Sequence, residues 1–494
     1  MRRAAFAGLW AVGLLARALE LRHSDSFDGD GAVYLLMAKH IAELKEFPLY
    51  MWLNHYGGTL SEYLAAACFR GFGVSLWAGR LPGLVWSCAL AALCYELARR
   101  LFGSRAAAVA LALALIPPYP ALPWMLFYQY GDMAVFACLA LLLLAVPAPD
   151  GRERGRLAAV GLVSGVGAWL SPGFSPFLLA EPVILRLRGE RTGRRELLAW
   201  LSGFLPGYAP AIVYNVRHPG AQALRLGGRL LGIGRADVAA GHLPALLARR
   251  VLWRLSLAPR ALLHIPISLA ALTSWADVAL FAAAAAWLWT RRKEPRLRAG
   301  AVIVGACSLC CVFFQAFLVA EDAPRFVFVF YPLFALSAAA FLSEGVPPAA
   351  GAATAALVLL LHGWSLAAAF ARPPVHHYED LAARLRAEGR TRAYADYWIA
   401  YPVTFYSGER VLVSPTLLDP TFADRYPPYT KSVRDAEGAV MIVDRERQPA
   451  AAAVVDAKLA ALGVGYRKER VDEFDVYSRF TRRLYPEELA PLPR

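Results

Sequence analysis

The chain has 494 residues, of which 58% are hydrophobic and only 18% charged, and its mean hydropathy is +0.42. Soluble globular domains carry about 25% charged residues, so this composition excludes an ordinary soluble enzyme. The net charge of +14 does not indicate a nucleic-acid partner, because the residues after 370 are nearly neutral. The excess lies in short loops between apolar segments, which is typical of the cytoplasmic side of a polytopic membrane protein.

Apolar stretches of about 20 residues, the length that crosses a bilayer, recur up to residue 370. With the basic loops placed in the cytoplasm, about eleven spans fit, near residues 4–21, 78–98, 106–122, 131–147, 157–171, 173–187, 196–214, 273–290, 300–319, 326–343 and 350–370. This odd count places residues 22–77, residues 215–272 and everything after 371 outside the cytoplasm. We therefore predict a polytopic α-helical membrane protein with a transmembrane domain over residues 1–370.

The first of these outer segments contains the stretch "SFDGDGAVYLLMAKHI", with Asp28 and Asp30 on either side of one glycine. From Val33 onward apolar residues recur at helical spacing. Lys39 and His40 fall on the opposite face, which predicts an amphipathic helix lying on the membrane surface. One aspartate makes a good N-cap for this helix, but the other requires a different explanation.

A second helix is predicted from "GGTLSEYLAAACF", because Thr59-x-x-Glu62 matches a capping box. Helix capping alone therefore accounts for Glu62 and for one of the two aspartates. On the residues alone, a catalytic role for this loop is one interpretation and helix capping is the other.

The residues after 371 have a different pattern, in which amphipathic helices alternate with strands. The pattern predicts helices over 378–389 and 451–463 and strands over 439–444, 464–471 and 474–480. Such alternation is typical of a small α/β domain, which we assign to residues 371–494. This region contains no glycine-rich phosphate loop, His/Cys cluster or nucleophile elbow, so we expect it to bind or cover and not to catalyse.

Several segments in order along the chain carry a resemblance to a known superfamily. "FDGDGAVYLLMAKHI", "FPLYMWLNHYGGTLSEYLAA" and "WAGRLPGLVWS" resemble the first extracytoplasmic loop of GT-C glycosyltransferases. They are most similar to bacterial relatives of protein O-mannosyltransferases and to the lipid A aminoarabinose transferase. Later segments fit the same group: "YQYGDMAVFACLALLLLA", "WLSPGFSPFLL", "YNVRHPGA", "PRFVFVFYPLFALSAA" and "AYADYWIAYPVTFYSGERV".

The resemblance implies transfer of a sugar, with inversion, from a polyprenyl-phosphate carrier to a lipid, glycan or protein acceptor. It also implies a protein of the inner (plasma) membrane, with its active site and C-terminal domain on the periplasmic side. The superfamily has an acidic pair at the end of the first span, commonly Asp-Glu. Here Asp30 matches the aspartate, whereas Gly31 stands where the glutamate is usual.

Such a reaction needs a base that deprotonates the acceptor and cations that hold the phosphate. We predict that Asp30 is the general base, with Asp28 as its assistant or alternative. Glu62 could orient the acceptor, or it could hold a divalent cation together with Asp28.

Four other residues are predicted to bind substrate. Arg325 starts an outer helix end and could hold the phosphate, although a snorkelling interfacial arginine is an equal alternative. Asp132 is an intramembrane carboxylate and therefore a functional candidate, with helix capping as its alternative. His55 and Tyr56 are polar residues of the first outer loop that could line the site.

Two other functions stay open on the sequence. A transporter or flippase of lipid-linked sugars would show inverted repeats and paired broken helices, but the sequence has one clear break, at Pro172 and Pro176, and no evident repeat. A non-catalytic relative that binds the lipid-linked sugar is the second alternative, suggested by Gly31.

Overall fold

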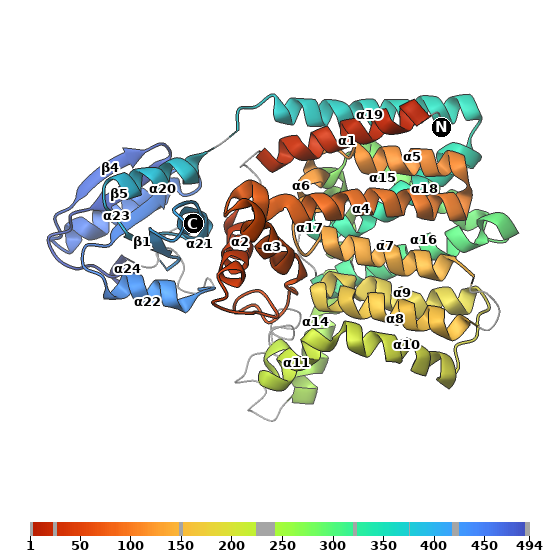
Figure 1. Cartoon of the computed structure of the whole chain (residues 1–494), viewed down its shortest axis with the longest axis horizontal. Coiled ribbons are helices and arrows are strands. Elements are labelled where there is room, and N and C mark those ends of the chain that lie inside the picture. The colour runs from red at the N-terminus through yellow and green to blue at the C-terminus, as the bar shows by residue number, and fades with distance from the viewer. Residues whose placement is uncertain are drawn as a thin grey trace. The chain divides into compact units, whose positions relative to one another are not determined.

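The computed structural model describes residues 3–22, 27–147, 152–223, 243–319, 324–374, 376–416 and 424–489. It is mostly helical with one small sheet (Figure 1). Its contacts form two compact units. The first unit comprises Met1–Glu20, His55–Ser61 and Leu81–Arg372, and the second comprises Leu21–Asn54, Glu62–Arg80 and Pro373–Arg494. The second unit thus contains much of the predicted first outer loop together with the predicted tail. A domain boundary near residue 370 stays a prediction.

Helices occur in each of the predicted spans. The first unit is built from apolar helices. They are α1 (Arg3–Arg22), α4 (Leu76–Phe102), α5 (Ser104–Leu115), α6 (Leu122–Leu126), α7 (Gly131–Ala145), α8 (Glu153–Leu170), α9 (Ser175–Leu187), α10 (Arg194–Gly207), α11 (Ala209–Arg217), α14 (Leu243–Leu272), α15 (Trp275–Thr290), α16 (Pro295–Phe313), α17 (Pro324–Val327), α18 (Tyr331–Ala340) and α19 (Pro348–Phe370).

Length and composition identify membrane-crossing helices in this unit. Among the described residues, 5 helical segments are long and apolar enough to cross a membrane, or up to 8 if each bent helix pair is one span. The chain is therefore a multi-pass membrane protein, and the count of eleven spans stays a prediction. Helix α14 lies in the segment predicted to be an outer loop, where the sequence analysis did not predict a helix.

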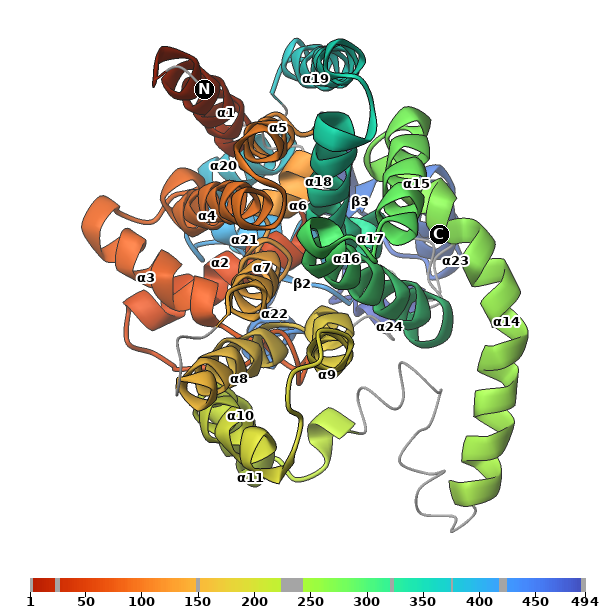
Figure 2. The same ribbon diagram turned by 90° about the vertical axis from the view of Figure 1, so that its right-hand side faces the viewer.

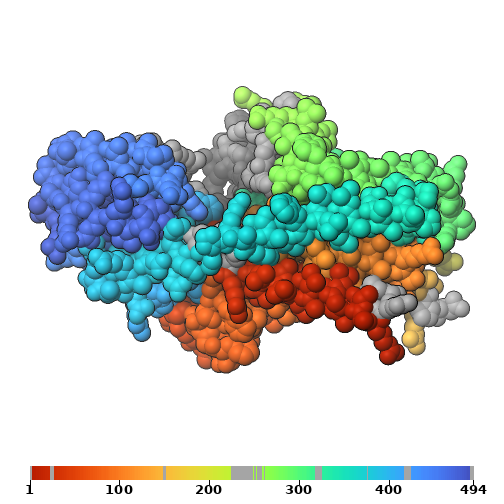
Figure 3. All heavy atoms as spheres, turned by 90° about the horizontal axis from the view of Figure 1, so that it is seen from above, coloured from red at the N-terminus to blue at the C-terminus, as the bar shows by residue number. Residues whose placement is uncertain are grey.

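The burial of these helices separates a core from a lipid-facing surface. All ten residues of α18 are buried, and Figure 2 shows this helix among α5, α15 and α16. Figure 3 shows α1 in red and α19 in teal on one face of the molecule. Leu15 of α1 is 60% exposed and Trp364 of α19 is 75% exposed, as expected for side chains that meet lipid.

Helix α5 ends inside this unit because two prolines follow it. Pro117 and Pro118 have no backbone N–H, so the carbonyl oxygens of Leu113 and Ala114 lose the donors that a continuing helix would supply. The hydroxyl of Tyr331 replaces one of these donors, with an O–O distance of 2.8 Å to the carbonyl of Leu113.

A buried arginine on α1 supplies the donor that the carbonyl of Ala114 lacks. Arg17, which is 0% exposed, donates from Nη2 to the carbonyl of Ala114 at 2.8 Å and from Nη1 to that of Leu115 at 2.9 Å. Its Nη1 also donates to the carbonyl of Gly13 at 3.0 Å, and its Nε donates to Ser87 Oγ at 2.7 Å. Arg17 thus satisfies backbone groups that lipid could not solvate.

The second unit contains a mixed sheet of five strands, in the order β2-β1-β3-β5-β4. The strands are β1 (Arg392–Tyr394), β2 (Leu412–Ser414), β3 (Val440–Asp444), β4 (Arg467–Val471) and β5 (Phe474–Ser478). Strand β1 pairs in parallel with β2 and β3, whereas β5 pairs antiparallel with β3 and β4. The strands β3, β4 and β5 confirm the predicted ones, and the short β1 and β2 were missed.

Helices cover both faces of this sheet. They are α20 (His377–Ala387), α21 (Tyr397–Tyr406), α22 (Pro427–Asp435), α23 (Pro449–Ala461) and α24 (Pro486–Leu489). Successive residues of a strand point to opposite faces. Accordingly Ile442 of β3 packs in the core that contains α20 and α21, and its neighbour Val443 packs in the core that contains α22 and α23. The α/β character of the tail is thus confirmed, with α20 and α23 at the predicted positions.

Candidate active site

The acidic motif lies at the start of α2 (Gly29–Ala42), in the second unit. Asp28 is the N-cap: its backbone is extended, and its Oδ1 accepts a hydrogen bond from the N–H of Gly31 at 2.8 Å. The prediction that one aspartate caps this helix is confirmed, and Asp28 is that residue. A catalytic contribution from Asp28 stays a prediction.

Asp30 lies in the first turn of α2, and its partners come from the far end of the chain. The hydroxyl of Tyr397 donates a hydrogen bond to Asp30 Oδ1. Nη2 of Arg425 lies 4.0 Å from the same oxygen. The Asp30 side chain is 31% exposed, so the carboxylate is held on one side and accessible on another. Neither Tyr397 nor Arg425 was among the predicted site residues.

The glycine between the two aspartates is required by Tyr397. A Cβ atom at Gly29 would lie 2.8 Å from Cε1 of the tyrosine ring and 2.9 Å from the tyrosine carbonyl oxygen. Tyr397 is itself the first residue of α21, whose N-cap Asp396 accepts a hydrogen bond from the N–H of Ile399 at 2.9 Å. Burial and the nearby Asp30 carboxylate raise the pKa of Tyr397 well above its usual range, so its hydroxyl keeps its proton and acts as the donor.

Gly29→Ala is expected to destabilise the protein by about 1–3 kcal/mol, the usual cost of overpacking, because the tyrosine ring and backbone must move. The measurement is the thermal unfolding of the detergent-solubilised full-length chain. Gly71→Ala is the matched control, since Gly71 lies within helix α3 (Leu60–Phe72) with open space around its Cβ position. Equal melting temperatures for Gly29→Ala and wild type would contradict the close packing of Tyr397.

Arg425 is fixed by contacts within the same unit. Its Nη1 donates to Asn54 Oδ1 at 3.2 Å, and its Nε donates to the hydroxyl of Tyr397 at 3.4 Å. Its backbone N–H donates to the hydroxyl of Tyr401 at 2.6 Å. The side chain is only 12% exposed, so a largely buried guanidinium lies next to the Asp30 carboxylate.

One expectation for α2 is wrong. Lys39 and His40 do not form an exposed polar face, because both side chains are buried against charged residues of the same unit. Glu409 accepts hydrogen bonds from Lys39 Nζ and from the hydroxyl of Tyr429 at 2.7 Å, and lies 2.9 Å from His40 Nε2. The other ring nitrogen of His40 lies 2.9 Å from Glu46 Oε1. Lys39, His40, Glu46, Glu409 and Tyr429 therefore form a buried ionic cluster, which we call the Glu409 cluster.

The charges in the Glu409 cluster shift the pKa values of its members. Burial lowers the pKa of His40, but hydrogen bonds to Glu409 and Glu46 outweigh this effect and raise it above 6.5. Burial raises the pKa of Glu409, but hydrogen bonds from His40, Lys39 and Tyr429 outweigh this and hold it well below its usual range. Both groups are thus charged at mildly acidic pH.

These shifts predict how stability changes with pH. A His40 pKa that is raised on folding contributes stability fully below about pH 6.5, and this contribution is lost as the pH rises through the folded-state value. The melting temperature of the wild type should therefore fall between pH 6 and pH 9 more steeply than that of His40→Gln. His376→Gln, at an exposed histidine, is the control and should keep the wild-type slope. Parallel wild-type and His40→Gln profiles would contradict a charged His40.

Glu62 lies in α3 of the second unit and is completely buried. Among the described residues, neither Glu62 nor Asp28 belongs to a group of three His, Cys, Asp or Glu side chains whose ligating atoms lie close together. One oxygen of Asp28 is engaged by the helix cap. A cation held by this pair stays a prediction.

Asp132 and His55 belong to the first unit. Asp132 is 0% exposed; its Oδ2 accepts a hydrogen bond from Ser61 Oγ at 2.7 Å and its Oδ1 accepts one from the N–H of Met133 at 2.6 Å. His55 Nδ1 lies 2.5 Å from the hydroxyl of Tyr214. Both side chains thus have structural contacts, and their part in substrate binding stays a prediction.

The last two predicted residues also lie in the first unit. Tyr56 is 8% exposed. Arg325 is half-buried in α17, and its guanidinium carbon lies 4.9 Å from the ring centroid of Phe326. A phosphate contact for Arg325 stays a prediction.

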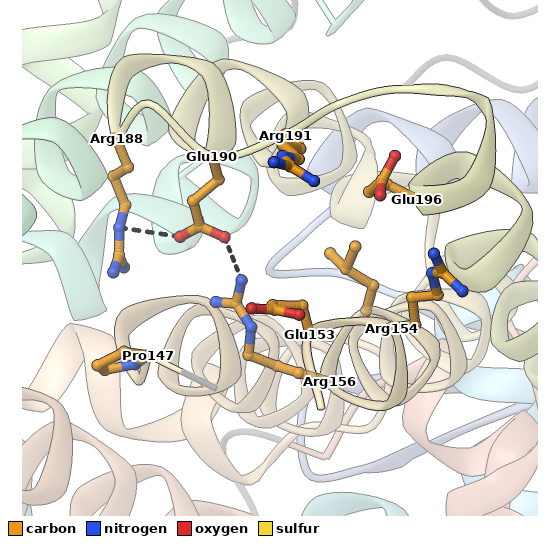
Figure 4. A pocket seen from close by; sticks show the side chains of 9 residues that line it. Pro147, Glu153, Arg154, Arg156, Arg188, Glu190, Arg191 and Glu196 are labelled. Atoms are coloured by element: carbon orange, nitrogen blue, oxygen red, sulfur yellow. Dashed lines mark hydrogen bonds and ion pairs between the residues drawn. The ribbon is translucent and has the colours of Figure 1, made fainter. Parts of the chain in front are cut away.

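A cavity of about 770 Å³ opens at the ends of α8 and α9 in the first unit (Figure 4). Most of its lining residues are charged, and Glu190 is paired to both Arg156 and Arg188. It is lined by Pro147, Glu153, Arg154, Arg156, Leu157, Arg188, Glu190, Arg191 and Glu196. Most of these residues lie in the basic loops predicted to be cytoplasmic, and none of them is a predicted site residue.

Comparison with known proteins gives two kinds of match. Residues 58–189 match the family model described as dolichyl-phosphate-mannose-protein mannosyltransferase, whereas no curated protein sequence matches the chain. Among solved structures, ArnT from Cupriavidus metallidurans bound to undecaprenyl phosphate is 15% identical with a TM-score of 0.65, covering 97% of this chain and 98% of ArnT.

A second solved structure extends the likeness. The archaeal oligosaccharyltransferase AglB from Archaeoglobus fulgidus, in complex with an inhibitory peptide and a dolichol-phosphate, is 14% identical with a TM-score of 0.53. The match covers 95% of this chain and 74% of AglB. At such identities the likeness concerns the fold. The shared fold and the family match confirm the resemblance of this chain to the GT-C superfamily of membrane glycosyltransferases.

Proposed function

We propose that this protein is an integral membrane glycosyltransferase that moves a sugar from a polyprenyl-phosphate carrier to an acceptor outside the cytoplasm. Asp30 is the general base: it deprotonates the acceptor hydroxyl, which attacks the anomeric carbon with inversion while the phosphate leaves. A glycosyl phosphate already has a good leaving group, so a positioned base and charge stabilisation are the main catalytic requirements.

The geometry of Asp30 carries this proposal. One carboxylate oxygen is hydrogen-bonded to Tyr397, and the side chain is partly exposed, as a base that meets a substrate must be. The separate N-cap, Asp28, leaves Asp30 with no capping role. Gly31 in place of the usual glutamate is compatible with the proposal, because the partners of Asp30 come from the tail.

The relatives support the donor class. ArnT was solved with undecaprenyl phosphate, and AglB with a dolichol-phosphate and a peptide. By analogy, a polyprenyl-phosphate sugar is the donor here, and the acceptor is a lipid, a glycan or a protein.

We further propose that α2 and the tail lie together on the periplasmic side of the inner membrane. The positive-inside pattern of the loops supports this orientation. The compact unit that contains both segments supports their location on one side.

Reconstitution of the purified full-length protein tests the proposal. Lipid-linked glycans of a deletion strain identify the sugar that accumulates on its carrier, and that donor is then supplied in liposomes with extracts of candidate acceptors. Transfer of labelled sugar to an acceptor supports the proposal. Movement of the intact donor across the bilayer without transfer would instead establish a flippase, and binding alone would establish a non-catalytic relative.

A further inference from the structure

We propose that Tyr397, supported by Arg425, is a positioning residue that orients the Asp30 carboxylate for proton transfer. This inference rests on the proposed function. It assigns to the C-terminal region a direct part in the reaction centre, beyond the covering role expected from its sequence.

The hydroxyl of Tyr397 is held in a fixed position. The tyrosine ring is 2% exposed and packs against the backbone at Gly29, at the start of the helix that carries Asp30. The N-cap Asp396 sets the start of α21, and the side chain of Gln448 donates to Asp396 Oδ2 at 3.1 Å. A hydroxyl held in this way restricts rotation of the carboxylate that accepts its hydrogen bond.

The two oxygens of the Asp30 carboxylate have different surroundings. Oδ1 of Asp30 accepts the hydrogen bond from Tyr397, while within the described part of the chain no donor is hydrogen-bonded to Oδ2. The acceptor hydroxyl would therefore transfer its proton to Oδ2. As the acceptor oxygen forms its bond to the anomeric carbon, the bond from that carbon to the phosphate oxygen breaks, and the phosphate leaves with the electron pair.

Arg425 lies next to both Tyr397 and Asp30. Its guanidinium donates a hydrogen bond to the hydroxyl of Tyr397 and lies 4.0 Å from Asp30, so it fixes the tyrosine hydroxyl beside the carboxylate. Asn54 accepts another of its hydrogen bonds. Arg425 is too far from Asp30 for a direct hydrogen bond, which leaves the tyrosine as the orienting group.

Tyr397→Phe tests the proposal, because it keeps the ring and removes only the donor. We expect kcat to fall roughly 10- to 100-fold, consistent with the loss of one hydrogen bond to a charged group, with little change in KM. Tyr394→Phe is the matched control at another buried tyrosine of the same unit, and should leave both quantities unchanged.

A double-mutant cycle separates this proposal from the proposed function. Unfolding is measured for wild type, Asp30→Ala, Tyr397→Phe and the double variant, because alanine, unlike asparagine, removes the acceptor of the hydrogen bond. Non-additive effects are expected for a pair in direct contact. Additive effects would overturn the contact, and a normal kcat in Tyr397→Phe would overturn the positioning role. If the cycle shows coupling but the wild-type protein transfers no sugar, the proposed function would be overturned. The Tyr397–Asp30 pair would then have no catalytic meaning.

Discussion

Asp30→Asn is expected to lower the rate of sugar transfer by about 10²–10⁴-fold, the usual loss when a general base is removed, with a melting temperature near that of wild type. Asparagine has nearly the same shape and still offers an oxygen to the hydroxyl of Tyr397, but it cannot take a proton. The measurement is transfer from a polyprenyl-phosphate sugar by the reconstituted full-length enzyme, with a melting curve for each variant.

Asp28 provides the matched control for this prediction. Asparagine is as good an N-cap as aspartate, so Asp28→Asn should keep the melting temperature near that of wild type and should lower transfer much less than Asp30→Asn does. Asp28→Ala should lower stability by about 1 kcal/mol through loss of the cap. Full activity in Asp30→Asn would mean that the base is another residue, and Asp28 and Glu62 would then be tested next.

Arg17→Met is expected to produce the largest loss of stability, about 2–6 kcal/mol. Methionine fills a similar volume but cannot donate, so the carbonyl groups of Ala114 and Leu115 would be left without this donor, at about 1–3 kcal/mol each. Pro118 cannot donate to the carbonyl of Ala114, and the N–H of Tyr119, four residues after Leu115, already donates to Ser365 Oγ at 3.0 Å. Unfolding in detergent micelles, followed by helical circular dichroism, measures the effect.

Arg3→Met is the control for the lost charge, because Arg3 is exposed on the same helix. It should unfold at the wild-type temperature. If Arg17→Met and Arg3→Met have equal stability, then Arg17 does not replace the missing backbone donors.

The sequence predicts features that depend on local pattern. Hydrophobic length predicts the helices of the membrane part, and the spacing from Val33 predicts α2 with an aspartate as its cap. Short runs rich in β-branched and aromatic residues predict β3, β4 and β5, since each of these strands has enough residues for such a run to stand out. Strands β1 and β2 have 3 residues each, which is too short for any periodicity to appear.

The contacts of the acidic helix could not be predicted in this way, because they join distant parts of the chain. Tyr397 lies 367 residues after Asp30, and Glu409 lies 370 residues after Lys39. Lysine and histidine on an amphipathic helix usually face water, so their burial follows only from the charged partner that the tail provides. The segment "AYADYWIAYPVTFYSGERV" was noted for its resemblance, and its tyrosines and glutamate were the available signal.

The separation of Asp30 and Tyr397 along the sequence has a consequence for biosynthesis. Translation at about 5–20 residues per second separates the synthesis of α2 from that of Tyr397 by roughly 20–70 s. During that interval the nascent helix carries Lys39 and His40 without Glu409, and Asp30 without its hydroxyl donor. The acidic helix therefore reaches its final environment only after nearly the whole protein has been made, and chains that terminate early lack an assembled reaction centre.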